Sequence, residues 1–284
     1  MEARSLDVTA RTGLVAVLGH PVAHSLSPRM HNAAFRAQNV DMVYLAFDVR
    51  RDRLRQAVEG LRALGMRGAN VTLPYKEEVV PLLDVVAPAA ARLGAVNTIV
   101  NDQGSLIGHN TDVAGFLAAL RKVRPQGAQG LRCLVVGAGG AARAVVAALT
   151  EDRAAEIWIH NRTQQRAVAL CESAQIWGAS RCEVADAAHL KVLAAGVDLL
   201  VNATSVGLSP AVKDSAVPVD IVDSHHLVLD VVYGPHPTAL VATAAARGAI
   251  ALDGREMLVM QAADSYHLWT GLEPPLQAMR ESLG

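Results

Sequence analysis

Residues 131–146, with the sequence LRCLVVGAGGAARAVV, decide the fold of this chain. An apolar run typical of a buried strand passes directly into a glycine-rich turn and then into an alanine-rich segment with helical spacing. Gly137 permits the tight turn, Gly139 lets backbone N–H groups approach a pyrophosphate, and Ala142 is small enough for the helix to pack closely on the strand. The stretch therefore predicts a strand, a glycine turn and a helix whose N-terminus binds the phosphates of a dinucleotide.

The end of the next predicted strand, at residues 156–160, indicates which dinucleotide is bound. A carboxylate about 20 residues after the glycines would hold the ribose 2′-OH of NAD. Here the strand is followed by Asn161, Arg162 and Thr163, with Arg166 one helical turn further and no carboxylate among them. Two guanidinium groups and a hydroxyl can hold a 2′-phosphate, so we predict NADP rather than NAD. The alternative, a solvated helix face that carries two arginines, stays open at this point.

The composition is that of a two-domain enzyme with no strong charge. The chain has 284 residues, 51% hydrophobic and 19% charged, and a formal net charge of −1. That length suggests two domains, and the balanced charge predicts neither a nucleic-acid nor a membrane partner. The cysteines Cys133, Cys171 and Cys182 show no paired spacing, which is typical of reduced thiols in a cytoplasmic protein. No signal peptide or membrane span is predicted.

Strands alternate with helices along the whole chain, which predicts an α/β fold. In the first part we expect strands at 14–18, 43–47 and 68–71, with helices after Pro28, around 54–64 and after Pro74. In the second we expect strands at 131–136, 156–160, 199–201, 228–231 and 249–252, and then a helix over 256–269. We therefore predict an N-terminal α/β substrate-binding and catalytic domain (1–112 plus 255–284), completed by the C-terminal helices, and a Rossmann-like doubly wound nucleotide domain (113–254).

Loops of the first domain concentrate polar residues after predicted strands. Ser27 precedes Pro28, so a helix N-cap and a ligand contact are both open for it. Ser25 has no capping explanation, and two hydroxyls in one loop suit a ligand that bears a carboxylate or several hydroxyls. His20 and His24 are four residues apart, but Pro21 disfavours the helix that would align them, so no metal site is predicted.

Lys76 and Asp112 lie in two other predicted loop segments, 70–76 and 108–112. Together they could act as an acid–base pair. An ammonium group can donate a proton to the alkoxide formed from a ketone, and a carboxylate can orient that ammonium group. A single lysine is usually a surface residue, and the sequence leaves open whether the two side chains meet.

Taken in order, these motifs resemble the shikimate dehydrogenase family. The motifs are Gly-x-Pro-x-x-His-Ser-x-Ser-Pro-x-x-His-Asn (19–32), Asn-Val-Thr-x-Pro-x-Lys (70–76), Gly-Ala-Val-Asn-Thr (94–98), Gly-x-Asn-Thr-Asp (108–112), the glycine turn, Asn-Arg-Thr (161–163) and Asn-Ala-Thr-Ser-x-Gly (202–207). The resemblance implies reversible NADPH-dependent reduction of 3-dehydroshikimate to shikimate, on the route to the aromatic amino acids. It also implies a small-molecule substrate and a monomer or homodimer.

The resemblance implies a role for each matched residue. Lys76 and Asp112 become the catalytic pair, with Lys76 supplying the proton. The residues implied to bind substrate are Ser25, Ser27, Thr72, Asn97, Asp112, Tyr233 and Gln261. The residues implied to bind NADP are Gly137, Gly139, Gly140, Ala141, Asn161, Arg162, Thr163, Arg166, Thr204 and Ser205.

Two departures from the family pattern and three alternatives accompany this interpretation. Residues 234–237 separate Tyr233 from a Thr-Ala-Leu segment where the family has Thr-Pro-Leu, and Glu256 stands where many members have glycine. Glu256 would alter the packing beside the nicotinamide or cap a helix. The first alternative is an NAD-linked quinate/shikimate dehydrogenase, which Ser27 and the two arginines disfavour. The second is an aminoshikimate dehydrogenase. The third is a non-catalytic ligand-binding regulator, which the intact Lys76 and Asp112 disfavour.

Overall fold

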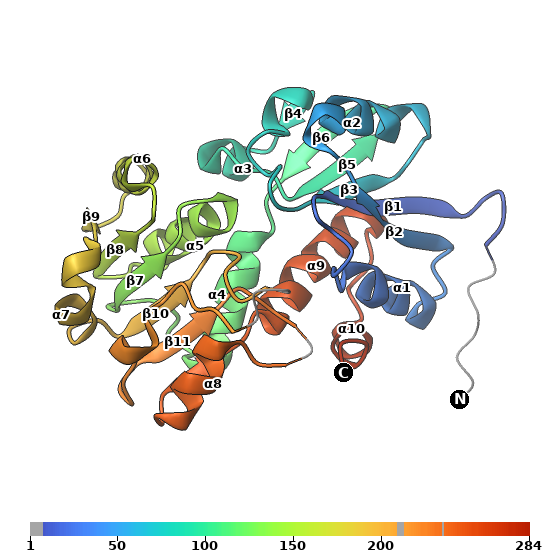
Figure 1. Cartoon of the computed structure of the whole chain (residues 1–284). Coiled ribbons are helices and arrows are strands. Elements are labelled where there is room, and N and C mark those ends of the chain that lie inside the picture. Colours follow the sequence, from blue (N-terminus) through green and yellow to red (C-terminus); the bar gives the residue numbers. More distant parts are fainter. Residues whose placement is uncertain (1–7, 209–212, 235) are drawn as a thin grey trace. The chain divides into compact units, whose positions relative to one another are not determined.

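The computed structural model describes residues 8–208, 213–234 and 236–284, and they form two compact units (Figure 1). Unit 1 comprises Met1–Thr111 and Leu258–Gly284, and unit 2 comprises Asp112–Met257. The predicted division differs from these units only in the placement of residue 112 and of residues 255–257. One residue of the departure after Tyr233, Pro235, lies outside the described residues.

Unit 1 contains a mixed sheet of six strands in the order β2-β1-β3-β5-β6-β4. The strands are β1 (Gly13–Gly19), β2 (Met42–Asp48), β3 (Gly68–Val71), β4 (Val85–Val86), β5 (Thr98–Asp102) and β6 (Ser105–His109). β5 runs antiparallel to both β3 and β6, whereas β1 is parallel to β2 and β3. The sequence predicted the first three strands but not the β5–β6 hairpin, whose turn uses Gln103 (φ 51°) and Gly104 (φ 95°).

The helical segments of unit 1 are α1 (Ser27–Ala37), η1 (Arg51–Arg53), α2 (Leu54–Ala63), η2 (Val80–Leu82), α3 (Pro88–Leu93), α10 (Leu276–Glu281) and most of α9 (Arg255–Thr270). The predicted helix after Pro74 is wrong, because residues 76–79 form turns that lead into η2. Pro81 explains the difference, since it lacks the N–H that a continuing helix would need at that position.

Helices α2 and α1 lie on opposite faces of the unit 1 sheet (Figure 1). Leu54, Val58 and Leu61 recur at helical spacing on α2 and pack with buried residues of β1 and β3. On the other face, His31 of α1 stacks on Tyr44 of β2 with ring centroids 4.4 Å apart. Unit 1 therefore has helices packed on both faces of its sheet.

Unit 2 is a parallel sheet in the order β12-β11-β10-β7-β8-β9. Its strands are β7 (Arg132–Val136), β8 (Glu156–His160), β9 (Cys182–Val184), β10 (Leu199–Asn202), β11 (Leu227–Asp230) and β12 (Ile250–Leu252). Its helical segments are α4 (Asp112–Val123), α5 (Gly140–Glu151), α6 (Gln164–Ile176), η3 (Ala187–His189), α7 (Leu190–Ala194), η4 (Val219–Ile221) and α8 (Ala239–Ala246). The predicted doubly wound fold is confirmed, and of these strands only β9 was not predicted.

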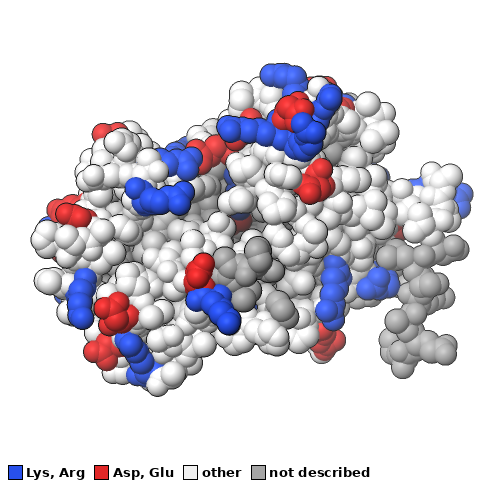
Figure 2. Space-filling view, viewed as in Figure 1, with Lys and Arg blue, Asp and Glu red and all other residues white. Residues whose placement is uncertain are grey.

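Charged side chains of both signs are interspersed on the face shown in Figure 2. Exposed ion pairs of the described residues include Arg181 with Glu183 at 2.8 Å. Among the described residues, no helix combines the length and the apolar character that crossing a membrane requires.

Candidate active site

The motif segments 19–32, 70–76, 94–98 and 108–112 meet at one edge of the unit 1 sheet. β1 and β3 are parallel neighbours, so the loops that follow Gly19 and Val71 leave the sheet at the same edge. β5 is antiparallel to β3 and pairs Thr98 with Asn70, so the segment that precedes Thr98 arrives at that edge. β6 is antiparallel to β5, and its end at His109 lies opposite Thr98. The strand directions alone therefore gather all four segments.

The two loops after β1 and β3 are held together by close contact. The N–H of His20 donates to the carbonyl of Leu73 at 3.0 Å. A Cβ atom on Gly19 would clash with the side chain of Thr72, so this position requires glycine. Thr72 is fixed in turn by its N–H, which donates to the carbonyl of Leu18 at 2.9 Å.

The serine loop differs from the capping prediction. Helix α1 has Leu26 as its N-cap and begins at Ser27, whose side chain makes no capping bond. Instead, the Oγ atom of Ser25 accepts from the N–H of Ser27 at 3.3 Å. Ser25, for which the sequence offered no structural explanation, therefore has a local structural role, and Ser27 is itself buried at 7% exposure. Their predicted contact with a substrate carboxylate stays a prediction.

Asn97 stands at the centre of a buried hydrogen-bond network. Its Oδ1 accepts from the N–H of Thr111 at 2.8 Å and from the hydroxyl of Thr98 at 3.0 Å. Its Nδ2 donates to the hydroxyl of Thr111 at 2.9 Å and to Oε1 of Gln261 at 3.3 Å. The network thus brings together the predicted residues Asn97 and Gln261, and Thr111 directly precedes Asp112 in the chain.

Lys76 is placed beside Asn97 through its backbone. The N–H of Val96 donates to the carbonyl of Lys76 at 2.8 Å, so Lys76 lies next to the residue that precedes Asn97. The Lys76 side chain is half-buried, and Asp112 is buried at 4% exposure at the start of α4. A buried carboxylate requires polar partners, as expected of a functional rather than a solvated position.

Sequence reasoning missed the second layer of this network. The Nδ2 of Asn70 donates to Oγ of Ser265 at 3.0 Å and to the hydroxyl of Thr98 at 3.1 Å, and its Oδ1 accepts from the hydroxyl of Tyr44 at 2.7 Å. Ser265 also contacts Thr98 at 2.8 Å between oxygens. The available signal was Ser265 itself, a polar residue four positions after Gln261 on an otherwise apolar helical face.

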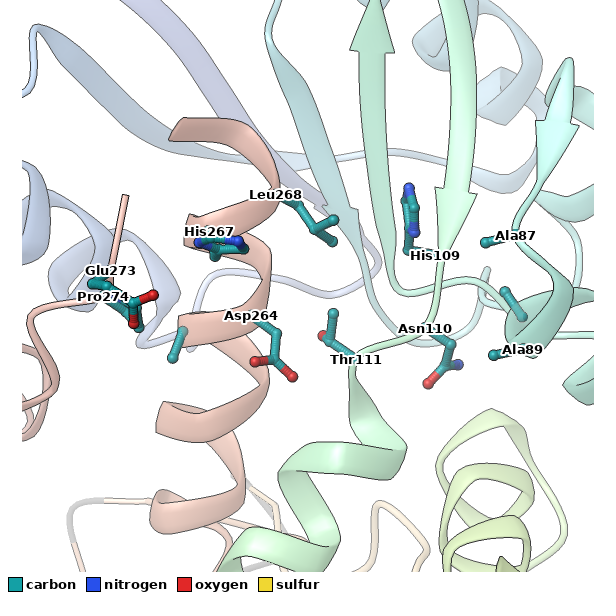
Figure 3. Close-up of a pocket in the computed structure, with 12 residues that line it drawn as sticks. Ala87, Ala89, His109, Asn110, Thr111, Asp264, His267, Leu268, Glu273 and Pro274 are labelled. Atoms are coloured by element: carbon teal, nitrogen blue, oxygen red, sulfur yellow. The ribbon is translucent and has the colours of Figure 1, made fainter. Parts of the chain in front are cut away.

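A separate cavity of about 470 Å³ lies within unit 1, between the end of β6 and helix α9 (Figure 3). Asp264 points from α9 toward Asn110 and Thr111, and burial raises the pKa of its carboxyl group. Burial lowers the pKa of His109, another lining residue. None of the residues predicted to bind substrate or cofactor lines this cavity, which meets the buried network only at Thr111.

No metal site is apparent in the described part of the chain, where no group of three or more candidate ligands is found. The Nδ1 of His20 lies 2.5 Å from Oδ1 of Asp48, which gives this histidine a carboxylate partner on β2.

In unit 2, the glycine turn lies where the strand order reverses. The chain passes from β7 to β8 on one side and to β10 on the other, which is the position where doubly wound sheets bind dinucleotides. Gly137 has φ 122°, and a Cβ there would lie 2.8 Å from the carbonyl oxygen of Ala203. A Cβ on Gly139, the N-cap of α5, would meet no atom within 4 Å. The turn therefore needs glycine at residue 137 and leaves open space at residue 139.

The predicted 2′-phosphate residues follow β8 and lead into α6. Asn161 donates from Nδ2 to the carbonyl of Thr163, the N-cap of α6, at 2.9 Å. Arg162 and Arg166 are exposed, and neither forms an ion pair with any residue that the structure describes. Two guanidinium groups without a carboxylate partner leave a concentrated positive charge at this helix start.

The loop after β10 is shaped by a buried aspartate. Asp230, at the end of β11, accepts from Nδ2 of Asn202 at 2.8 Å and from the hydroxyl of Thr238 at 2.7 Å. Burial raises the pKa of Asp230 to about 6. The Oδ1 of Asn202 accepts from the hydroxyl of Thr204 at 2.8 Å. The Thr204 hydroxyl thus has a structural partner, while neighbouring Ser205 is exposed.

The two departures from the family pattern have local explanations within unit 2. Thr238 caps α8 by accepting from the N–H of Val241 at 3.3 Å, so the altered segment after Tyr233 still ends in a capped helix. Glu256 lies in the first turn of α9 and pairs with Nζ of Lys122 at 3.0 Å. The glutamate therefore joins α9 to α4.

Unit 2 is doubly wound and has its glycine turn at the switch point, and unit 1 has polar loops at one edge of its sheet. These features define a dinucleotide-dependent enzyme. Three family models match the chain in sequence order. They are the shikimate dehydrogenase substrate binding domain over residues 17–99, shikimate / quinate 5-dehydrogenase over 119–231, and the shikimate 5′-dehydrogenase C-terminal domain over 254–283.

Individual relatives agree with these models. A shikimate dehydrogenase (NADP(+)) from Moorella thermoacetica is 46% identical over 98% of this chain and 96% of its own length. The crystal structure of shikimate 5-dehydrogenase from Thermus thermophilus in complex with NADP(H) and shikimate is 40% identical, with a TM-score of 0.85 over 95% of this chain and 98% of that one. Quinate dehydrogenase from Corynebacterium glutamicum in complex with NAD is 38% identical, with a TM-score of 0.86 and the same coverage. The chain belongs to the shikimate dehydrogenase family.

Proposed function

We propose that Lys76 and Asp112 carry the chemistry of the reaction that family membership assigns to this chain, the reversible NADPH-dependent reduction of 3-dehydroshikimate to shikimate. The observation that carries this proposal is the convergence of four loop segments at one edge of the unit 1 sheet. The first three segments contain Ser25, Thr72, Lys76 and Asn97, and the fourth segment, after β6, leads into Asp112.

The unit 2 residues fit NADP. The open space at Gly139 and the start of α5 suit a pyrophosphate, and the exposed Arg162 and Arg166 suit a 2′-phosphate. Gly140, Ala141 and the loop at Thr204 and Ser205 complete the proposed cofactor contacts. When bound, the reduced nicotinamide supplies a hydride to the carbonyl carbon of the substrate.

The chain's own residues position the substrate and handle the proton. The hydroxyls of Ser25 and Ser27 bind the substrate carboxylate. Thr72, Asn97, Gln261 and Tyr233 contact the ring and its hydroxyls. The buried network fixes the Asn97 and Gln261 amides before substrate arrives, so little entropy is lost on binding.

Lys76 donates a proton to the carbonyl oxygen as the alkoxide develops, and Asp112 orients the ammonium group and accepts a hydrogen bond from a substrate hydroxyl. In the reverse direction, Lys76 accepts the proton. The half-buried position of the lysine and the buried position of the aspartate suit these roles, because partial exclusion of water strengthens the interaction of both charges with the substrate.

The test is a steady-state assay of wild type, Lys76→Ala and a control, Lys191→Ala, with shikimate or quinate and with NADP or NAD. Lys191 is 78% exposed and pairs only with Asp220 among the described residues, so its loss should leave turnover unchanged. We expect wild type to prefer shikimate with NADP, and Lys76→Ala to lower kcat by about 10²- to 10⁴-fold with little change in KM. Near-normal turnover of Lys76→Ala would exclude Lys76 from the mechanism, and a preference for quinate with NAD would overturn the substrate and cofactor assignment.

A further inference from the structure

Two of the three cysteines lie in contact inside unit 2. Cys171 is on the buried face of α6, and Cys182 is the first residue of β9. The Sγ atom of Cys182 lies 3.1 Å from that of Cys171, and the two residues are 5% and 6% exposed, respectively. Cys133 lies on β7, where its thiol donates to the carbonyl of Leu131.

The fold explains how residues eleven positions apart come into contact. Helix α6 ends at Ile176, and the chain reverses at Gly178, which has φ 97°. The returning chain then joins the sheet, where Cys182 pairs with Ile157 of β8. Because α6 packs on this edge of the sheet through Ala167, Leu170, Cys171 and Ala174, both thiols are held by regular structure.

We propose that Cys171 and Cys182 are a modification site that closes to an intramolecular disulfide when the protein meets hydrogen peroxide. The sulfur atoms are already in contact, and a disulfide requires a separation of about 2.05 Å, so closure needs a movement of about 1 Å. Both thiols belong to unit 2, so the modification needs no contribution from unit 1.

The reaction has two steps whose atoms balance. The Cys171 thiolate attacks the peroxide, the O–O bond breaks, a sulfenic acid forms and the first water leaves with the thiol proton. The Cys182 thiol then attacks the sulfenyl sulfur, the S–S bond forms, the S–O bond breaks and the second water leaves. Two thiols are oxidised by two electrons in all, and the peroxide is reduced to two waters.

The contact between the sulfurs makes Cys171 the first nucleophile. The Cys182 thiol donates to the Cys171 sulfur, which lowers the pKa of Cys171 and raises the pKa of Cys182. Thiolate is the reactive form, so peroxide should attack at Cys171 while the protonated Cys182 waits as the resolving thiol.

The surroundings select the class of oxidant. The small exposure of both cysteines favours a reagent of the size of hydrogen peroxide. Glu172 and Glu183 lie beside the pair, and Glu183 is itself paired with Arg181 at 2.8 Å. Oxidised glutathione should react more slowly, because it is much larger than hydrogen peroxide and both sulfur atoms are buried.

The test is peroxide treatment of the folded wild-type protein, followed by unfolding, alkylation of remaining thiols, digestion and mass spectrometry. We expect a peptide pair joined through Cys171 and Cys182, about 2 Da lighter than its reduced parts and separated by dithiothreitol. Cys133 should be fully alkylated. The oxidised protein should melt roughly 5 °C higher than the reduced protein, and Cys171→Ala should abolish this shift while Cys133→Ala retains it.

Two results would overturn the proposal. One is recovery of both cysteines in alkylated form after peroxide has oxidised other residues of the same sample. The other is oxidation of Cys171 to sulfinic acid, or linkage between two molecules, without the internal disulfide. Because the peptide map is made on wild type, the outcome does not depend on the folding of any variant.

Discussion

The buried imidazole of His31 should make unit 1 sensitive to acid. The side chain is 0% exposed, its two ring nitrogens have no hydrogen-bond partner among the described residues, and burial lowers its pKa from 6.5 to about 3. Between pH 6.5 and pH 3, the unfolded chain therefore binds a proton at this residue that the folded chain does not. Stability falls as the pH decreases through this range, because each proton favours the unfolded state.

The magnitude follows from the two pKa values. At pH 8 the residue is neutral in both states and has no effect of this kind. At pH 5 the unfolded state is favoured by about 2 kcal/mol, and below pH 3 the difference approaches about 5 kcal/mol. His31→Phe keeps a ring against Tyr44 and removes the titration, so the variant should lose about 2 kcal/mol less than wild type between pH 8 and pH 5.

The assay is urea unfolding at both pH values, followed by the fluorescence of Trp269. Trp269 is 8% exposed and lies 5.4 Å from the His31 ring, so it reports on unit 1. A background of Trp158→Phe and Trp177→Phe removes the unit 2 signals. Any fixed packing cost of the phenylalanine cancels, because only the change with pH is compared. Equal losses in wild type and variant would refute the reasoning.

Two further predictions concern the cofactor and a backbone contact. Arg162→Ala should raise the KM for NADPH about tenfold and leave the KM for NADH nearly unchanged. The reason is that the variant loses one charge-assisted hydrogen bond to the 2′-phosphate, worth about 1.4 kcal/mol. Equal effects on both cofactors would contradict the 2′-phosphate assignment. Gly68→Ala should destabilise unit 1 by about 3 kcal/mol or more in chemical unfolding, because φ is 158° and the added Cβ would clash with the Ile99 carbonyl and the Trp269 indole. Its control, Gly60→Ala on α2, meets no atom within 4 Å and should stabilise by about 0.5 to 1 kcal/mol; a Gly68→Ala protein as stable as this control would contradict the prediction.

Local signals predicted much of the fold. The strand, glycine turn and helix around Gly137 could be predicted because apolar periodicity and turn chemistry are encoded within a few residues. The prediction of a helix after Pro74 was wrong because it rested on helical spacing alone. Pro81 lacks the N–H group that a continuing helix would need there. The capping alternative for Ser27 is wrong because α1 begins one residue earlier than that alternative required, with Leu26 as its N-cap.

The candidate site was predictable as a set of residues but not as a set of contacts. Asn97 and Gln261 were both implied by the family resemblance, yet their hydrogen bond joins residues 164 positions apart and could not be predicted from either one. The Asn70–Ser265 bond spans 195 positions, and no local pattern encodes it. The Cys171–Cys182 contact was not predictable for another reason, because it depends on the short strand β9, whose three residues carry little periodic signal.

The two segments of unit 1 have a consequence for the order in which the protein can fold during synthesis. Unit 2 is continuous from Asp112 to Met257, so all of it has been synthesised before the ribosome reaches Ser265. Until then Asn70 and Thr98 lack the Ser265 hydroxyl, with which both of them form hydrogen bonds in the finished protein. A nascent chain therefore has every strand of the N-terminal sheet but lacks the contacts of α9 while the nucleotide unit folds. That interval is when the N-terminal segment most needs protection by chaperones.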